Sequence, residues 1–167
     1  MSERKVQIFR AADAPSLVEA GCMSVKPVSP VQRAGMDKLI QAGFLEGDEI
    51  KVLVNIPGFS LTYVWFKKDY PLPLHSHDAD CLYYVIAGSI EFGAETLGPR
   101  DSFFLPAGAA YTYKPGPDGV EVLEFRHASQ FDFVNLARNE AFYEKAAALI
   151  AENRDGWRTA VRPTAAG

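Results

Sequence analysis

The stretch from Pro71 to Gly88, PLPLHSHDADCLYYVIAG, decides the fold. Its two histidines, His75 and His77, stand two positions apart, and side chains at i and i+2 of a strand face the same side. Both imidazoles can therefore point into one cavity, as two ligands of a single metal ion must. Cys81 and Tyr83 continue the even spacing and face the same way if the strand stays regular through the intervening turn.

Short apolar runs flank this stretch on both sides and predict a β-sandwich or barrel. Each run is rich in β-branched or aromatic residues and is separated from the next by Gly, Pro or Asp, which is typical of all-β domains. Long helices do not alternate with the runs, so a parallel βαβ sheet is disfavoured. The predicted strands are Ile50–Ile56, Ser60–Phe66, Leu82–Ile86, Ser89–Phe92, Ser102–Leu105, Tyr111–Tyr113 and Val120–Phe125.

The segment before the strands, residues 1–49, is predicted to be an N-terminal extension that packs on the barrel of residues 50–128. Residues 6–9 favour a short strand, and Cys22–Pro30, with two prolines, favours extended chain. Asp37–Phe44 (DKLIQAGF) favours one or two turns of helix.

The segment after the strands, residues 129–167, is predicted to be a C-terminal helix and tail. Asn139–Arg154 (NEAFYEKAAALIAENR) carries apolar residues at helical spacing, with Asn139 as the N-cap. We expect Gly156 to stop the helix and residues 161–167 to be frayed. The apolar stripe of the helix should pack on the outside of the barrel.

The histidine stretch resembles the first motif of the cupins, His-x-His, three or four residues, an acid, six residues and Gly. His75, His77 and Gly88 fall in register, and Cys81 stands at the acid position. This resemblance implies an all-β cupin double-stranded β-helix, or jelly-roll barrel.

The segment Arg100–Tyr111 (RDSFFLPAGAAY) resembles the second cupin motif, Gly-x5-Pro-x-Gly-x2-His. Pro106 and Gly108 match, whereas Arg100 stands at the first Gly position and Tyr111 at the closing His position. Two of the four usual metal-ligand positions are therefore changed.

The resemblance implies a divalent metal, which could be Fe, Mn, Ni or Zn. The candidate ligands are His75, His77, Tyr111 and Cys81, a mixture of hard and soft donors that leaves the metal identity open. Tyr111 is equally well explained as a core aromatic residue, and Cys81 slightly better as a small buried hydrophobe. Asp80 is a second-rank ligand, although a turn residue explains it most simply.

Three side chains at the end of the last predicted strand also bear on the site. Glu124 and Arg126 alternate with His127, and one of these two could point into the barrel and contact a polar or anionic substrate. His127 is best explained as an exposed strand-end residue.

The presence of a cysteine at position 81 is also similar to the thiol dioxygenase branch of the cupins. In that branch, a cysteine can be linked covalently to a tyrosine.

Composition restricts the partners of the chain. Its 167 residues suit one domain, and a net charge of −4 disfavours nucleic acid and anionic membrane surfaces. Cys22 and Cys81 make no disulfide framework, and residues 1–10 contain no apolar signal segment, so the cytoplasm is expected.

We also expect a homodimer, because pairing edge strands across a two-fold axis protects them.

Two functions are compatible with this pattern. The first is a metal-dependent enzyme, of dioxygenase, isomerase or lyase type, that acts on a small organic substrate, with His77 and Tyr111 as catalytic residues. The second is a metal-free cupin that binds a small molecule or uses histidine as an acid–base catalyst. The sequence does not decide whether the chain is an enzyme.

Overall fold

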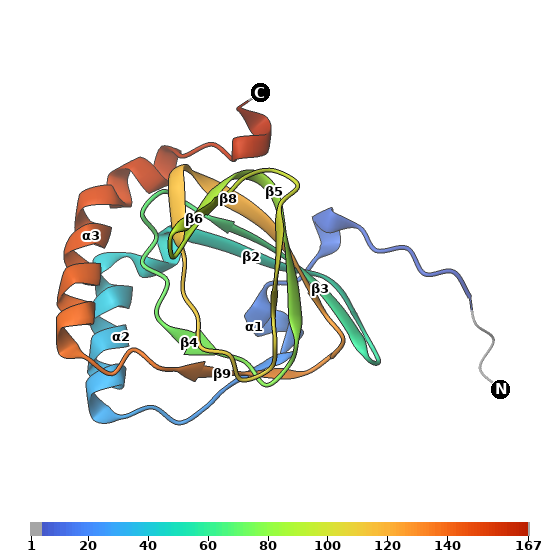
Figure 1. Cartoon of the computed structure of the whole chain (residues 1–167), viewed down its shortest axis with the longest axis horizontal. Coiled ribbons are helices and arrows are strands. Elements are labelled where there is room, and N and C mark those ends of the chain that lie inside the picture. Colours follow the sequence, from blue (N-terminus) through green and yellow to red (C-terminus); the bar gives the residue numbers. More distant parts are fainter. Residues whose placement is uncertain (1–4, 167) are drawn as a thin grey trace.

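The computed structural model describes residues 5–166 and has two β-sheets that form a barrel, with helices along one side (Figure 1). The fold is the cupin jelly roll that the two motifs predicted. The larger sheet has the order β2 (Asp48–Ile56), β3 (Phe59–Phe66), β8 (Lys114–Arg126), β5 (Cys81–Phe92) and β6 (Glu95–Leu97), and β7 (Ser102–Leu105) also pairs with β5. The smaller sheet has the order β1 (Met23–Val25), β9 (Phe131–Asn135) and β4 (His75–Ser76).

Glycines set the turns and close approaches of the larger sheet. The β2–β3 hairpin turns at Pro57-Gly58, where Gly58 has a φ of 79°, in the region that favours glycine. Gly88, the last residue of the first motif, has a φ of 73°, and a Cβ there would lie 2.1 Å from the carbonyl oxygen of Gly119. The motif therefore requires glycine at this position for the close contact between β5 and β8.

The predicted strands are mostly confirmed, with changes in extent. Leu82–Ile86 and Ser89–Phe92 are parts of the single strand β5, and the last predicted strand is the end of the longer β8. The prediction for Tyr111–Tyr113 is wrong, because only Tyr111 makes a bridge, to His75.

The smaller sheet was not predicted. Its strand β9 lies in the segment where we expected only a helix and a tail, and it pairs in parallel with β1 and antiparallel with β4. The extended chain expected at Cys22–Pro30 contains β1. Strands β1 and β4 are too short for alternation to reveal them, whereas the five residues of β9 (FDFVN) were not recognised as a strand between the barrel and the helix.

The N-terminal segment differs from the prediction at both ends. Residues 6–9 form no strand, and Val6, Ile8 and Phe9 are exposed by 92%, 72% and 46% on an arm that leaves the barrel (Figure 1). The arm leads to η1 (Ala11–Asp13) and α1 (Leu17–Ala20). The helix expected at Asp37–Phe44 begins earlier, as α2 (Pro30–Ala42), and ends at Gly43 with a φ of 113°.

The C-terminal helix α3 (Glu140–Thr159) begins as predicted, with the Asn139 side chain accepting a hydrogen bond from the N–H of Ala141 at 2.9 Å. Gly156 does not stop it, because a glycine inside a helix weakens the helix without breaking it. The expectation of a frayed tail is wrong for the described part. Residues 163–165 form the short helix η3, and Glu121 accepts hydrogen bonds from the N–H and hydroxyl of Thr164.

Helices α2 and α3 lie side by side against the barrel, and with η2 (Phe44–Glu46) they form what we call the helix layer (Figure 1). The polar atoms of its buried tyrosine and tryptophan are all hydrogen-bonded. The Tyr143 hydroxyl donates to the carbonyl of Ala137 at 2.6 Å and accepts from Asn135, and the Trp157 ring N–H donates to the carbonyl of Lys68 at 2.8 Å. No helix within residues 5–166 is both long and apolar enough to cross a membrane.

Candidate functional site

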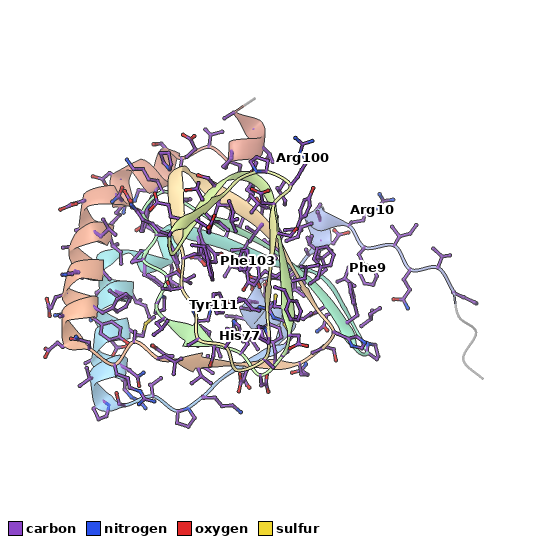
Figure 2. All side chains as sticks on the ribbon, in the orientation of Figure 1. Phe9, Arg10, His77, Arg100, Phe103 and Tyr111 are labelled. Carbon is purple, nitrogen blue, oxygen red and sulfur yellow. The ribbon has the colours of Figure 1, made fainter. Side chains whose placement is uncertain are left out.

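A cavity of about 80 Å³ lies inside the barrel, between the two sheets. Two imidazoles, three phenols, a threonine hydroxyl and an ion pair contribute its polar surface, and apolar side chains form the rest. Figure 2 shows His77 and Tyr111 within the barrel, whereas Phe9 and Arg10 lie on the N-terminal arm. The polar lining residues are Thr62, His75, His77, Tyr83, Tyr111, Tyr113, Glu124 and Arg126.

The main chain joins the two motifs at the cavity. The N–H of His75 donates to the carbonyl of Tyr111 at 3.1 Å, and the N–H of Tyr111 donates back to the carbonyl of His75 at 2.9 Å. The turn of the second motif also contacts the first, since the N–H of Gly108 donates to the carbonyl of His77 at 2.7 Å. The predicted residues His75, His77 and Tyr111 are therefore brought together.

Main-chain carbonyls orient both imidazoles. The Nδ1 of His75 lies 2.7 Å from the carbonyl oxygen of Pro73, and the Nδ1 of His77 lies 2.5 Å from that of Asp132. A carbonyl only accepts hydrogen bonds, so each Nδ1 carries the proton in the neutral ring and each Nε2 keeps its lone pair. Neither Nε2 has a hydrogen-bond partner within residues 5–166.

The anchor of His77 is itself held in place. The Asp78 N–H donates to a carboxylate oxygen of Asp132 at 2.8 Å, and the Asp132 N–H donates to a carboxylate oxygen of Asp78 at 2.7 Å. This reciprocal pair fixes the start of β9 against the histidine strand. His77 thus has a defined position although it lies just beyond β4.

Burial keeps both histidines neutral. It lowers the pKa of His75 to about 4. It also lowers the pKa of His77, and the positive charge of Arg126 acts in the same direction. At neutral pH both rings are therefore unprotonated at Nε2 and able to accept a proton or a hydrogen bond.

Tyr111 is part of a tyrosine pair. Its hydroxyl oxygen lies 2.5 Å from that of Tyr83, and its ring centroid lies 4.3 Å from that of His75. Burial raises the pKa of both phenols far above the usual value. One hydroxyl proton joins the two oxygens and the other is left to donate, so the pair is a hydrogen-bond donor.

Cys81 is buried at the start of β5 but does not line the cavity. Burial, with the nearby charge of Glu124, raises the pKa of its thiol to about 12. Asp80 is also outside the cavity, because one of its carboxylate oxygens accepts from the N–H of Ala107 at 2.7 Å. Asp80 is thus explained by its bond to the second-motif turn, and Cys81 by its burial in the core.

Both Glu124 and Arg126 point into the barrel, where the sequence suggested only one of them. The Nη1 of Arg126 lies 2.7 Å from a carboxylate oxygen of Glu124, close enough for an ion pair but not aligned as a hydrogen bond. The guanidinium also lies over the ring of Phe131, 4.2 Å from its centroid. His127, the next residue, is exposed as expected.

The cavity side chains fit only in part the divalent metal that the cupin resemblance implies. The two imidazoles suit a metal, since each has a fixed tautomer and a free Nε2. However, no group of three His, Cys, Asp or Glu side chains within residues 5–166 is placed to hold one ion. The Tyr111 hydroxyl is already shared with Tyr83, and Cys81 lies outside the cavity. The residues present therefore do not complete a protein ligand set.

Two cavity residues were missed by sequence reasoning. Thr62 on β3 and Tyr113, which follows the second motif, both line the cavity and are buried. Thr62 lies in a continuous apolar run, and Tyr113 was placed in a strand that does not form. The even spacing of Tyr111 and Tyr113 was the one available signal that both face the same side.

The fold and the paired histidine and Pro-x-Gly segments define the class: the chain has the fold of a cupin. The polyketide cyclase RemF from Streptomyces resistomycificus is similar at 16% identity, with a TM-score of 0.57 and coverage of 89% of this chain and 97% of RemF. A protein of unknown function with a cupin-like fold from Ralstonia eutropha JMP134 is 17% identical, with a TM-score of 0.52 and coverage of 91% and 90%. The sequence matches no family model and no curated protein.

Proposed function

We propose that this cupin binds a small organic molecule in the barrel cavity and acts on it by proton transfer from and to histidine. One observation carries the proposal. His75 and His77 are neutral, each is anchored through Nδ1 to a main-chain carbonyl, and each has an unpartnered Nε2 at the same cavity. A neutral imidazole with a free Nε2 can accept a proton, and its lowered pKa makes it a weaker base than a histidine in water.

The neighbouring groups supply the complementary donor. His77 is the base in this proposal, and the Tyr83–Tyr111 pair donates a hydrogen bond to an oxygen on which negative charge develops. Abstraction of a proton next to a carbonyl needs both functions. Isomerisation returns the proton to another carbon through the enolate. Elimination removes the same proton and expels a leaving group from the neighbouring carbon, and the leaving group takes up a proton from protonated His77. These are the reaction types that we propose.

The cavity limits the size of the molecule. One water needs roughly 10–15 Å³ of such space. A volume of about 80 Å³ therefore suits a ligand of roughly six non-hydrogen atoms. Aromatic walls at Phe131 and Phe133 favour a ligand with an apolar side.

A binding screen tests the proposal. Compounds of up to roughly eight non-hydrogen atoms, a limit set by the cavity volume, are screened by ligand-observed NMR against the wild type, Ile50→Phe and Ile56→Phe. Ile50 lines the cavity and Ile56 does not, although both are half-buried on β2. We expect ligands that bind the wild type and Ile56→Phe but not Ile50→Phe, and an equal response of all three proteins would contradict the proposal.

A second assay tests the chemistry of each ligand found. Carbonyl compounds are incubated with protein in D₂O, and exchange of the hydrogen next to the carbonyl is followed by NMR. We expect exchange to be accelerated by the wild type and lost in His77→Gln, which keeps a polar side chain but has no base. Exchange that persists in His77→Gln would remove His77 from the proposed role.

A metal-dependent enzyme, of dioxygenase, isomerase or lyase type, is the second candidate. The observation in its favour is the histidine pair itself, because both imidazoles have the tautomer that a metal requires. It ranks second because a third protein ligand is not in place within the described chain.

We also propose a homodimer that uses the N-terminal arm. The arm presents Val6 and Ile8 to solvent, and β2 is an edge strand of the larger sheet. Pro15 and Ser16 already pair with this edge at Lys51 and Val52, and the exposed alternating apolar residues of the arm suit strand addition along the rest of it between two copies. Light scattering should give a dimer for the full chain and a monomer for a variant that lacks residues 1–10, and equal masses would exclude this role for the arm.

A further inference from the structure

Several buried polar atoms in the cavity wall have no hydrogen-bond partner within residues 5–166. They are the Nε and Nη1 of Arg126, the Oγ1 of Thr62 and the hydroxyl of Tyr113. Arg126 and Thr62 are each 2% exposed, and Tyr113 is 5% exposed. Because nearly all buried polar groups in native proteins are bonded, a cluster of unbonded ones at a cavity indicates that polar atoms of an occupant belong there.

Arg126 is the strongest of these groups. Its guanidinium stays charged at any physiological pH and needs acceptors when it is removed from water. Phe131 covers one face of it, and the carboxylate of Glu124 lies near Nη1 without a well-aligned hydrogen bond. Nε has no acceptor within the described residues.

We propose that the ligand of this cavity is a small carboxylate whose oxygens accept hydrogen bonds from Arg126, an inference that rests on the proposed small-molecule function. A carboxylate carries the charge and the acceptors that a guanidinium binds best. The position of Glu124 indicates that a carboxylate oxygen fits beside Nη1. The ligand would then occupy the side of Arg126 that Glu124 leaves unbonded.

Glu124 sets the strength of this interaction. One cation and one anion leave the cavity without net charge, so an incoming carboxylate is attracted by Arg126 and repelled by Glu124. Removing the charge of Glu124 should therefore strengthen carboxylate binding, whereas removing the charge of Arg126 should abolish the preference for carboxylates. A neutral ligand should respond weakly to either change.

Matched pairs of acids and amides test the inference. Acetate, propionate and lactate are compared with acetamide, propionamide and lactamide, because each pair has the same size and differs in charge. Dissociation constants are measured by NMR titration at constant pH and ionic strength. We expect at least one acid to bind the wild type about tenfold more tightly than its amide, since charge-assisted hydrogen bonds are the stronger ones.

Variants identify the group responsible. Arg126→Gln should reduce the binding of the acid to that of its amide, and Glu124→Gln should tighten the acid several-fold and leave the amide unchanged. Thr62→Val removes an uncharged hydroxyl from the same cavity, so it can weaken acid and amide alike but should keep their ratio. Ile56→Phe, outside the cavity, is the control and should leave both affinities unchanged. If Arg126→Gln does not fold, the test rests on Glu124→Gln, and an unchanged affinity for the acid in that variant would contradict the proposal.

The outcomes separate this inference from the function on which it rests. If amides bind as tightly as their acids in every pair, the proposal of a carboxylate ligand is wrong, and the proposed small-molecule function is unaffected. Binding of neither acids nor amides, together with no ligand from the wider screen, would overturn both. An acid preference that survives Arg126→Gln and ignores Glu124→Gln would also overturn the assignment to Arg126.

Discussion

The helix layer and the cavity wall are both buried, but they differ in how many of their buried hydroxyl groups are hydrogen-bonded. In the helix layer the hydroxyl of Tyr143 both donates and accepts a hydrogen bond. In the cavity wall the hydroxyl of Tyr113 is buried to a similar degree and has no partner in the described chain. The Nε of Arg154 on α3 also has no hydrogen bond in the described chain, but it lies 3.3 Å from a carboxylate oxygen of Glu46. The unbonded groups of the cavity wall instead face a space that a ligand could occupy.

Acidification should affect the two regions in opposite directions. The pKa of His75 is about 4 in the folded protein against 6.5 in the unfolded chain, so above pH 6.5 the residue contributes nothing to pH dependence. As the pH falls from 6.5 towards 4, the unfolded chain binds a proton that the folded protein does not. The free energy of unfolding should fall by roughly 3 kcal/mol from this residue.

Asp48 lies beside the helix layer, and its effect on the free energy of unfolding as the pH falls is opposite to that of His75. Burial raises its pKa to about 7, so the folded protein binds a proton first and gains stability as the pH falls below 7. Urea unfolding at about pH 7 and pH 4.5 should show a smaller loss for His75→Gln, and a larger loss for Asp48→Asn, than for the wild type. Equal pH dependence of wild type and His75→Gln would contradict the buried neutral histidine.

Added volume should be costly in the helix layer and mild in the cavity. A Cβ at Gly35 would lie 2.3 Å from the ring of Tyr143, so Gly35→Ala should destabilise by roughly 1–3 kcal/mol. Ile50→Phe adds more atoms but directs them into open space. Thermal and urea unfolding should show the greater loss for Gly35→Ala, and the reverse order would mean that the cavity is not open.

A matched pair of tyrosine variants compares the hydroxyls directly. Tyr143→Phe leaves the carbonyl of Ala137 without its donor and should cost about 1–2 kcal/mol. Tyr113→Phe removes a hydroxyl with no partner, so it should be neutral or slightly stabilising. Similar losses in urea unfolding would show that Tyr113 is bonded in solution and would weaken the contrast between the regions.

The smallest expected effect concerns the end of α3. Nothing lies within 4 Å of a Cβ placed on Gly156, and the residue is inside the helix. Gly156→Ala should therefore stabilise the protein by about 0.5–1 kcal/mol through helix propensity. A loss of stability in thermal unfolding would indicate that the helix layer needs flexibility there.

The strongest sequence signals concerned long, regular elements. The β-branched runs at Ile50–Ile56 and Ser60–Phe66 specify strands through local preference, and Gly88 marks a close approach that only glycine allows. The beginning of α2 was also encoded in the sequence. Ser29 is the N-cap, Pro30 is the first helical residue, and Ser29 and Gln32 form a capping box. That signal was outweighed by the prolines, which favoured extended chain.

The site was predictable only in part. The spacing of His75 and His77 placed both rings on one side, and the second motif placed Tyr111 beside them. The pairing of Tyr111 with Tyr83, and the exclusion of Cys81 from the cavity, depend on how β5 and the second motif pack. Such contacts between distant segments leave no periodic pattern in a single sequence.

The most direct test of the central claim, that the cavity histidines work as free imidazoles, is elemental mass spectrometry of the untagged protein purified without chelators. Our account predicts Fe, Mn, Ni and Zn far below one equivalent, with the same content in the His75→Ala, His77→Ala double variant. Near-stoichiometric metal in the wild type that is lost in the double variant would contradict it and establish the histidine pair as a metal site.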